Sequence, residues 1–246
     1  MKNETEARFT LEKKIVDMID DLKWDDPHGG DPSSVVSLAI LQLYHESKDD
    51  VEKAEEDSID QYLAKEEIKK YESENFTPII IRPATVCGFA PRQRFDLSVN
   101  ILTNHAINKN KIIVFGGNQL RPHLHIQDYC DVVKLFLTAP SEKIKNEIFN
   151  VSYQNMSINE IAVIVKKVVE EEFNQLNQIQ IVNEKSEDIR SYHINSDKIK
   201  EVLGFQPKKS VESAVRELCL SFKNKVFSNS FDNDFYFNVK RLKNIK

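Results

Sequence analysis

The segment Thr77–Pro83, with the sequence TPIIIRP, constrains the fold of this chain more strongly than any other part. Three consecutive isoleucines between two prolines predict a short β-strand that is buried on both faces, which is typical of a parallel sheet. Helices and short strands are expected to alternate after it, so the pattern indicates an α/β fold. A strand of this kind needs partners on both edges, and the rest of the chain offers few candidates. We therefore expect a small, incomplete sheet covered by helices.

The composition excludes several classes of protein. Of the 246 residues, 40% are hydrophobic and 30% are charged, which does not fit collagen-like, disulfide-scaffold or wholly disordered chains. A net charge of −5 disfavours a nucleic-acid partner bound through a basic face. No apolar run is long enough to span a membrane, and the polar N-terminus is neither a signal nor a transit peptide. Three widely spaced cysteines fit a reduced setting, so we expect a cytoplasmic protein.

Composition and pattern divide the chain near residue 56. Residues 1–56 are acidic and mostly helical by pattern, and nothing in them identifies their origin. Residues 57–227 hold the alternating helices and strands, and residues 228–246 form a C-terminal tail. Within the middle part, Ser157 and Glu160 have the spacing of a capping box and predict the start of a helix.

Several short motifs follow one another after residue 57, and each is weak alone. They are RPATVCG at residues 82–88, RFD at 94–96 with Asn100, GGNQLRPHLHIQD at 116–128, IFNV at 148–151, DIRSY at 188–192 and LGFQP at 203–207. Taken in this order, they resemble the C-terminal half of the NAD-dependent epimerase/dehydratase family, the extended short-chain dehydrogenases that act on nucleotide sugars. The resemblance covers residues 57–246.

The resemblance implies a partial Rossmann-like fold of the extended short-chain dehydrogenase type, with the smaller α/β substrate-binding domain. The family opens with a strand and a G-x-x-G-x-x-G loop that lets the backbone approach the pyrophosphate of the cofactor. This chain has 6 glycines and no such sequence. We therefore expect the N-terminal dinucleotide-binding half to be missing.

Two functions are compatible with these features. The first is an NAD(P)-dependent nucleotide-sugar epimerase or dehydratase, possibly truncated or split, that oxidises the sugar transiently by hydride transfer. NAD or NADP would be its cofactor, and a second chain could supply the dinucleotide-binding half. The second is a non-catalytic nucleotide-sugar-binding module or an inactive gene remnant, which the absent glycine loop favours. A homodimer is compatible with either function.

Arginines are the expected ligands of the substrate diphosphate, because the planar guanidinium holds phosphate oxygens through two hydrogen bonds. The resemblance places Arg121, just after the Gly-Gly turn, and Arg190, just before Tyr192, in this role. Asn100 would donate to the same phosphates. Without the resemblance, surface ion pairs and a helix cap would explain these three residues as well.

The catalytic residues implied by the resemblance are Tyr62 and Lys65. Tyr62 would act as the acid or base on a substrate hydroxyl, and Lys65 would lower the pKa of Tyr62 and hold the nicotinamide ribose. Pro83 and Thr85 are the further cofactor-binding residues. The family spaces its Tyr and Lys four residues apart, whereas here they are three apart, so they share a helix face with a different geometry. With Lys65 fixed, the family spacing instead places Gln61 at the tyrosine position, and a surface Tyr and Lys on a charged helix remain the alternative.

His123 and His125 alternate on a predicted strand, with Asp128 close behind them. Two histidines and one carboxylate at this spacing on a strand are a weak indication of a metal-binding site. The resemblance implies that they pack structurally, so no metal is expected.

Overall fold

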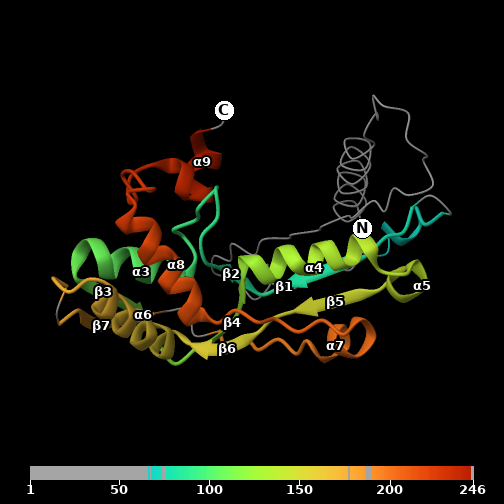
Figure 1. Ribbon diagram of the computed structural model, residues 1–246, viewed down its shortest axis with the longest axis horizontal. Helices are drawn as coiled ribbons and strands as arrows, with labels where there is room; N and C mark the ends of the chain where they lie inside the picture. The colour runs from blue at the N-terminus through green and yellow to red at the C-terminus, as the bar shows by residue number, and fades with distance from the viewer. Residues whose placement is uncertain (1–65, 67, 74–75, 177, 187–189, 245–246) are drawn as a thin grey trace, which may run out of the picture. The chain divides into compact units, whose positions relative to one another are not determined.

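The computed structural model describes residues 66, 68–73, 76–176, 178–186 and 190–244 (Figure 1). The chain separates into two compact units. Among the described residues, the first unit comprises those up to Arg82 together with Lys134–Phe149, and the second comprises Pro83–Val133 and those from Asn150 onward. The predicted boundary near residue 56 lies outside the described residues.

The first unit contains the strand that the isoleucine run predicts. Strand β1 (Ile80–Pro83) pairs with β5 (Ile148–Val151). The amide of Ile80 donates to the carbonyl of Glu147 at 3.0 Å, and that of Ala84 donates to the carbonyl of Val151 at 2.8 Å, so both bonds keep the same offset and the strands are parallel. The three isoleucines are at most 4% exposed. The prediction of a buried strand in a parallel sheet is therefore confirmed.

Two helical segments belong to the described part of the first unit. They are the end of α4 (Ile126–Thr138) and the short α5 (Ser141–Ile144). The ring of Phe136 on α4 lies 5.4 Å from that of Phe149 on β5, and both are fully buried. This aromatic pair attaches the helix end to the strand.

The second unit contains two further small sheets. In the first sheet, β2 (Thr85–Cys87) pairs in parallel with β4 (Leu120–His125), and β4 pairs in antiparallel fashion with β6 (Gln154–Ser157). The other sheet joins β3 (Lys111–Phe115) to β7 (Gln180–Glu184) in parallel. The described residues thus form three separate sheets of two or three strands each, whereas the sequence predicted one small sheet.

Three helices of the second unit enclose its apolar core. They are α3 (Ser98–Lys109), α6 (Ile158–Glu172) and α8 (Val211–Lys223), which lie side by side (Figure 1). The core contains buried aliphatic side chains from all three helices and from β3, among them Val99, Ile112, Val114, Val165, Val168 and Val215. Helix α6 begins at the predicted capping box, in which Ser157 Oγ accepts from the Glu160 amide at 3.2 Å and Glu160 Oε2 accepts from the Ser157 amide at 2.7 Å.

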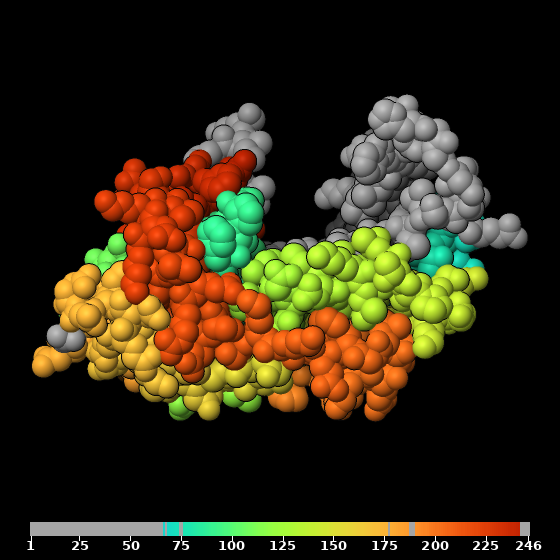
Figure 2. Space-filling model, in the orientation of Figure 1, coloured from blue at the N-terminus to red at the C-terminus, as the bar shows by residue number. Residues whose placement is uncertain are grey.

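The C-terminal residues fold back onto the loop that joins β2 to α3. Helix α7 (Asp197–Leu203), the 3₁₀ turn η2 (Asp234–Tyr236) and α9 (Asn238–Asn244) are their remaining elements. The amide of Phe95 donates to the carbonyl of Tyr236 at 3.0 Å, and that of Asn238 donates to Asp96 Oδ2 at 3.1 Å. In Figure 2 the teal-green loop lies against the red C-terminal segment. We call this arrangement, formed by residues 88–97 and 227–241, the C-terminal clasp.

The predicted α/β class is confirmed by these elements. None of the helices in the described ranges is long and apolar enough to cross a membrane.

Candidate functional site

The two predicted catalytic residues, Tyr62 and Lys65, lie outside the described residues. Their pairing, and the role of Lys65 in cofactor binding, stay predictions. The other predicted site residues all belong to the second unit, so their arrangement can be described.

Arg121 lies on strand β4, and several neighbouring residues fix its side chain. Its Nη1 donates to the carbonyl of Leu120 at 3.0 Å and also to the carbonyl of Arg190. The guanidinium carbon lies 4.9 Å from the centre of the Tyr192 ring, within the range of a cation–π interaction. The side chain is half-buried. Its charge therefore has a fixed position near the surface.

The extended segment that contains Arg190 runs beside the start of β4. The amide of Leu120 donates to Ser191 Oγ at 2.9 Å, and the amide of Tyr192 donates back to the carbonyl of Leu120 at 3.3 Å. Arg190 and Tyr192 are exposed. The structure thus brings the segment of the second predicted phosphate ligand next to Arg121, although the two lie far apart in the sequence.

Asn100 has a different environment from the one expected of a ligand residue. It is 3% exposed, and its Oδ1 accepts from the amide of Gly88 at 3.2 Å while its Nδ2 donates to the carbonyl of Arg94 at 2.9 Å. The amide group is therefore used to shape the loop between β2 and α3. Gln93, which sequence reasoning missed, has a similar role, since it donates to the carbonyl of Gly88 and accepts from Ala90.

The predicted cofactor residues Pro83 and Thr85 lie at the ends of two strands that follow one another in the chain and belong to different sheets. Pro83 is the last residue of β1, and Thr85 is the first residue of β2. Both are half-buried. Thr85 is opposite His123 in the pairing of β2 with β4, so the two side chains lie on one face of the sheet.

His123 forms a contact that the sequence did not indicate. Its Nε2 lies 2.8 Å from the hydroxyl of Ser98, the first residue of α3. The ring is 1% exposed, and burial lowers the pKa of His123 to about 4, so it is neutral near pH 7. No motif suggested this contact, because Ser98 and His123 belong to elements whose packing is set only by the folded chain.

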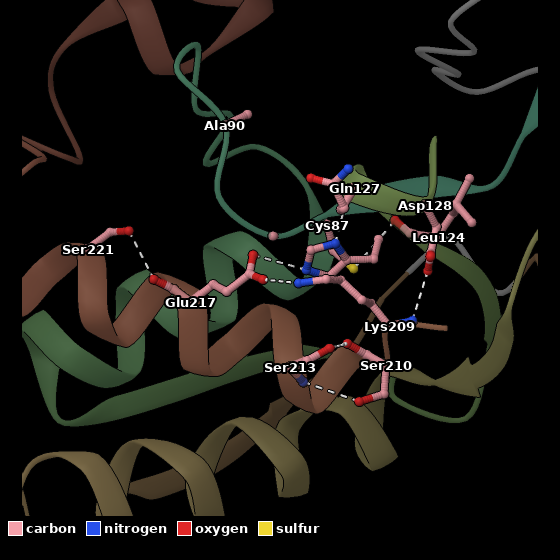
Figure 3. Close-up of polar contacts among 12 residues, drawn as sticks. Cys87, Ala90, Leu124, Gln127, Asp128, Lys209, Ser210, Ser213, Glu217 and Ser221 are labelled. Atoms are coloured by element: carbon pink, nitrogen blue, oxygen red, sulfur yellow. Dashed lines mark hydrogen bonds and ion pairs between the residues drawn. The ribbon is translucent and has the colours of Figure 1, made fainter. Parts of the chain in front are cut away.

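His125 is the centre of a second polar cluster (Figure 3). Its Nε2 lies 3.0 Å from Oε2 of Glu217 on α8, and Lys209 Nζ lies 2.7 Å from Oε1 of the same carboxylate. Asp128 accepts hydrogen bonds from the amides of Lys208 and Lys209. Burial lowers the pKa of His125, against the opposing effect of Glu217. This cluster connects the start of α4 to α8.

The same cluster explains one glycine of the RPATVCG motif. Gly88 has a φ of +102°, and a Cβ atom there would lie 2.9 Å from Nε2 of His125. Within the described ranges, no three His, Cys, Asp or Glu side chains are grouped so that they could hold a metal ion. The described side chains that His123 and His125 contact are those of Ser98 and Glu217.

Comparison with known proteins supports the resemblance seen in the sequence. Residues 45–152 match the model of the NAD dependent epimerase/dehydratase family. The dTDP-glucose 4,6-dehydratase of Shigella flexneri is 26% identical over 136 residues, and that of Escherichia coli is 24% identical over 136 residues. Each alignment covers 53% of this chain and 37% of the relative, so the chain spans well under half of either protein.

Solved structures of the same kind share the fold. A UDP-glucose 4-epimerase from Thermotoga maritima, crystallised with UDP-glucose, matches with a TM-score of 0.57 at 21% identity. The match covers 69% of this chain and 53% of the epimerase chain. The dTDP-glucose 4,6-dehydratase from Bacillus anthracis, in complex with NAD, matches with a TM-score of 0.57 at 18% identity. The match covers 80% of this chain and 60% of the dehydratase chain. The resemblance to the epimerase/dehydratase family and the extended short-chain dehydrogenase fold are thereby confirmed.

Proposed function

We propose that this chain provides the nucleotide-sugar-binding part of an epimerase or dehydratase. The family match supports this general kind of function. Among the related structures, two hold UDP-glucose and others hold NAD or NADPH. A nucleotide sugar of this class is the ligand that we assign to the chain, with its diphosphate at Arg121 and Arg190.

The observation that carries the proposal is the hydrogen bond from the Arg121 guanidinium to the backbone carbonyl of Arg190, which brings the two predicted phosphate residues next to each other. A diphosphate requires cations in fixed positions, because a freely rotating side chain loses conformational entropy when it binds. The Leu120 and Arg190 carbonyls and the Tyr192 ring already orient the guanidinium of Arg121. Asn100 acts indirectly in this proposal, since it fixes the loop before α3.

We assign no site for NAD or NADP to the described residues by themselves. Their glycine pair, Gly116-Gly117, forms a turn that packs against the protein, because a Cβ on Gly117 would overlap the side-chain amide of Asn159. The chain has no G-x-x-G-x-x-G loop elsewhere in its sequence. We therefore assign no reaction step through the cofactor, and the predicted hydride transfer with Tyr62 and Lys65 would need a dinucleotide site supplied by another polypeptide.

A second candidate function is a binding module without turnover. The absence of the glycine loop from the sequence favours it, because the backbone then has no close approach to a pyrophosphate. Both candidates share the nucleotide-sugar site, and they differ in whether a partner restores catalysis.

Calorimetric titration with UDP-glucose tests the site. Charged hydrogen bonds are each worth about 1.5–3 kcal/mol, so Arg121→Ala should weaken binding by roughly 10- to 100-fold. Arg121→Lys should fall between that variant and the wild type, because it keeps the charge but loses the planar fork. Lys167→Ala, which removes an exposed cation on α6, is the matched control and should bind normally. Equal affinity of Arg121→Ala and wild type would exclude the phosphate role.

A titration with NAD tests whether this chain alone forms a dinucleotide site. No binding is expected from the chain alone. Micromolar affinity for NAD without a partner would contradict the incomplete dinucleotide site.

A further inference from the structure

Two residues to which the sequence assigned no part in ligand binding, His123 and Ser98, lie beside predicted substrate and cofactor residues. Arg121 and His123 are two positions apart on β4, so their side chains share one face of the sheet. Thr85 faces the same way, opposite His123 on β2. On this face, His123 therefore lies next to Thr85, a predicted cofactor residue, and two positions from Arg121, to which we assign the diphosphate.

Ser98 is fixed above this face by His123. Its hydroxyl lies 2.8 Å from Nε2 of the histidine, and the ring itself is almost fully buried. Ser98 begins α3, but Leu97 is the capping position and no side chain caps the helix. The hydroxyl of Ser98 is therefore not used as a helix cap, and it is only partly buried.

The environment of the ring determines which hydrogen bond Ser98 makes. The backbone carbonyl of Arg121 acts on His123 and raises its pKa, against the larger effect of burial. Among the described residues, Nδ1 of His123 has no hydrogen-bond partner, and the contact of Nε2 with Ser98 is compatible with either tautomer. We assign the proton to Nδ1, because the Arg121 backbone acts on the ring as a hydrogen-bond acceptor and Nε2 is already next to a hydroxyl. Nε2 of the neutral ring then accepts the hydroxyl proton of Ser98. The oxygen of Ser98 consequently presents lone pairs, and not a proton, to a ligand.

A group that presents only lone pairs discriminates between the parts of a nucleotide sugar. Phosphate oxygens near pH 7 have no proton to donate, whereas sugar hydroxyls do. The reacting sugar must also lie near the cofactor. Thr85 is a predicted cofactor residue, so the sugar is expected near Thr85 on this face. Both arguments assign the sugar end of the ligand to Ser98 and the diphosphate to Arg121.

We propose that Ser98 determines specificity for the sugar, because its oxygen accepts a hydrogen bond from a sugar hydroxyl while His123 holds the side chain in place. This inference rests on the proposed nucleotide-sugar site and adds a contact at the sugar end. Ser98 touches the ligand in this arrangement, and His123 is a positioning residue.

Calorimetry with two probes, UDP-glucose and UDP, tests the inference. Ser98→Ala should bind UDP-glucose about five-fold more weakly, the effect of one neutral hydrogen bond, and should bind UDP as the wild type does. Ser98→Thr, which keeps the hydroxyl, should restore UDP-glucose binding. Ser228→Ala removes an exposed hydroxyl in the C-terminal segment and is the matched control.

The two ligands separate the possible outcomes. An equal loss for UDP and UDP-glucose in Ser98→Ala would mean a structural role and would overturn the inference. So would unchanged affinity for UDP-glucose. If wild-type protein bound UDP and Ser98→Ala gave either of these results, the proposed diphosphate site would be supported and the role of Ser98 would be disproved. If wild-type protein bound neither ligand, the proposed function itself would fail, and the inference with it.

Discussion

The guanidinium of Arg121 stacks on the ring of Tyr192, with its central carbon 4.9 Å from the ring centre, although the two residues are far apart in the sequence. The stack occurs because the segment 190–192 pairs with the start of β4 through Leu120. An exposed aromatic ring restricts the positions open to a guanidinium without neutralising its charge. Tyr192 therefore restricts the orientation of Arg121, the residue to which we assign the diphosphate.

We predict that Tyr192→Leu weakens UDP-glucose binding by roughly two- to five-fold, the worth of an exposed cation–π contact. Tyr192→Phe should bind normally because it keeps the ring. Calorimetry on both variants measures the effect, with Tyr153→Leu as a control that removes another exposed tyrosine ring. A Phe variant as weak as the Leu variant would show that the hydroxyl, and not the ring, matters.

The C-terminal clasp depends on Asp96. Its carboxylate receives two hydrogen bonds from Arg94, at 2.9 and 2.8 Å, and one from the amide of Asn238 at 3.1 Å. Asp96→Ala should lower the free energy of unfolding by about 1.5–3 kcal/mol, as expected for hydrogen bonds to a charged group. It should also speed tryptic cleavage at Lys240. Asp232→Ala, an exposed carboxylate in the same segment, is the control, and equal cleavage rates in the two variants would disprove the anchoring role of Asp96.

The three cysteines should differ sharply in reactivity. Burial raises the pKa of both the Cys87 and the Cys219 thiol to about 12, whereas Cys130 is exposed on α4. Because the thiolate is the reactive form, a disulfide reagent should titrate one thiol in the native protein and three in urea. Cys130→Ser should remove the fast reaction completely. A second fast thiol in the native state would contradict the burial of Cys87 and Cys219.

Local sequence patterns predicted the features that depend on neighbouring residues. The isoleucine run specified a buried parallel strand, because both faces of such a strand need apolar side chains. Ser157 and Glu160 specified the start of α6, since a capping box is formed within one turn. The family resemblance assigned Arg121 and Arg190 to one site, and the structure places the backbone of Arg190 against the side chain of Arg121, while their role in binding stays a prediction.

Long-range contacts could not be predicted in this way. The sequence did not predict that the side-chain amide of Asn100 bonds to the backbone of Gly88 and Arg94, because residue spacing does not show how the loop folds. Its predicted role in phosphate binding stays a prediction. The partners of His123 and His125, which are Ser98 and Glu217, come from α3 and α8. Helix packing brings them to β4, and no short motif records that packing. The predicted catalytic pair lies outside the described residues and is not tested.

The buried ring of His123 predicts a specific pH dependence of stability. A histidine in an unfolded chain titrates near pH 6.5, whereas burial lowers the pKa of His123 in the folded protein to about 4. The unfolded state therefore binds more protons between these values, so the stabilising effect is complete above about pH 6.5 and is lost as the pH falls toward about 4. Urea unfolding from about pH 7 to about pH 4.5 should show a steeper loss of stability in the wild type than in His123→Gln, with a difference of at most about 3 kcal/mol. His193→Gln removes an exposed histidine and should follow the wild-type profile. Parallel profiles for wild type and His123→Gln would show that His123 does not titrate on unfolding as its burial requires.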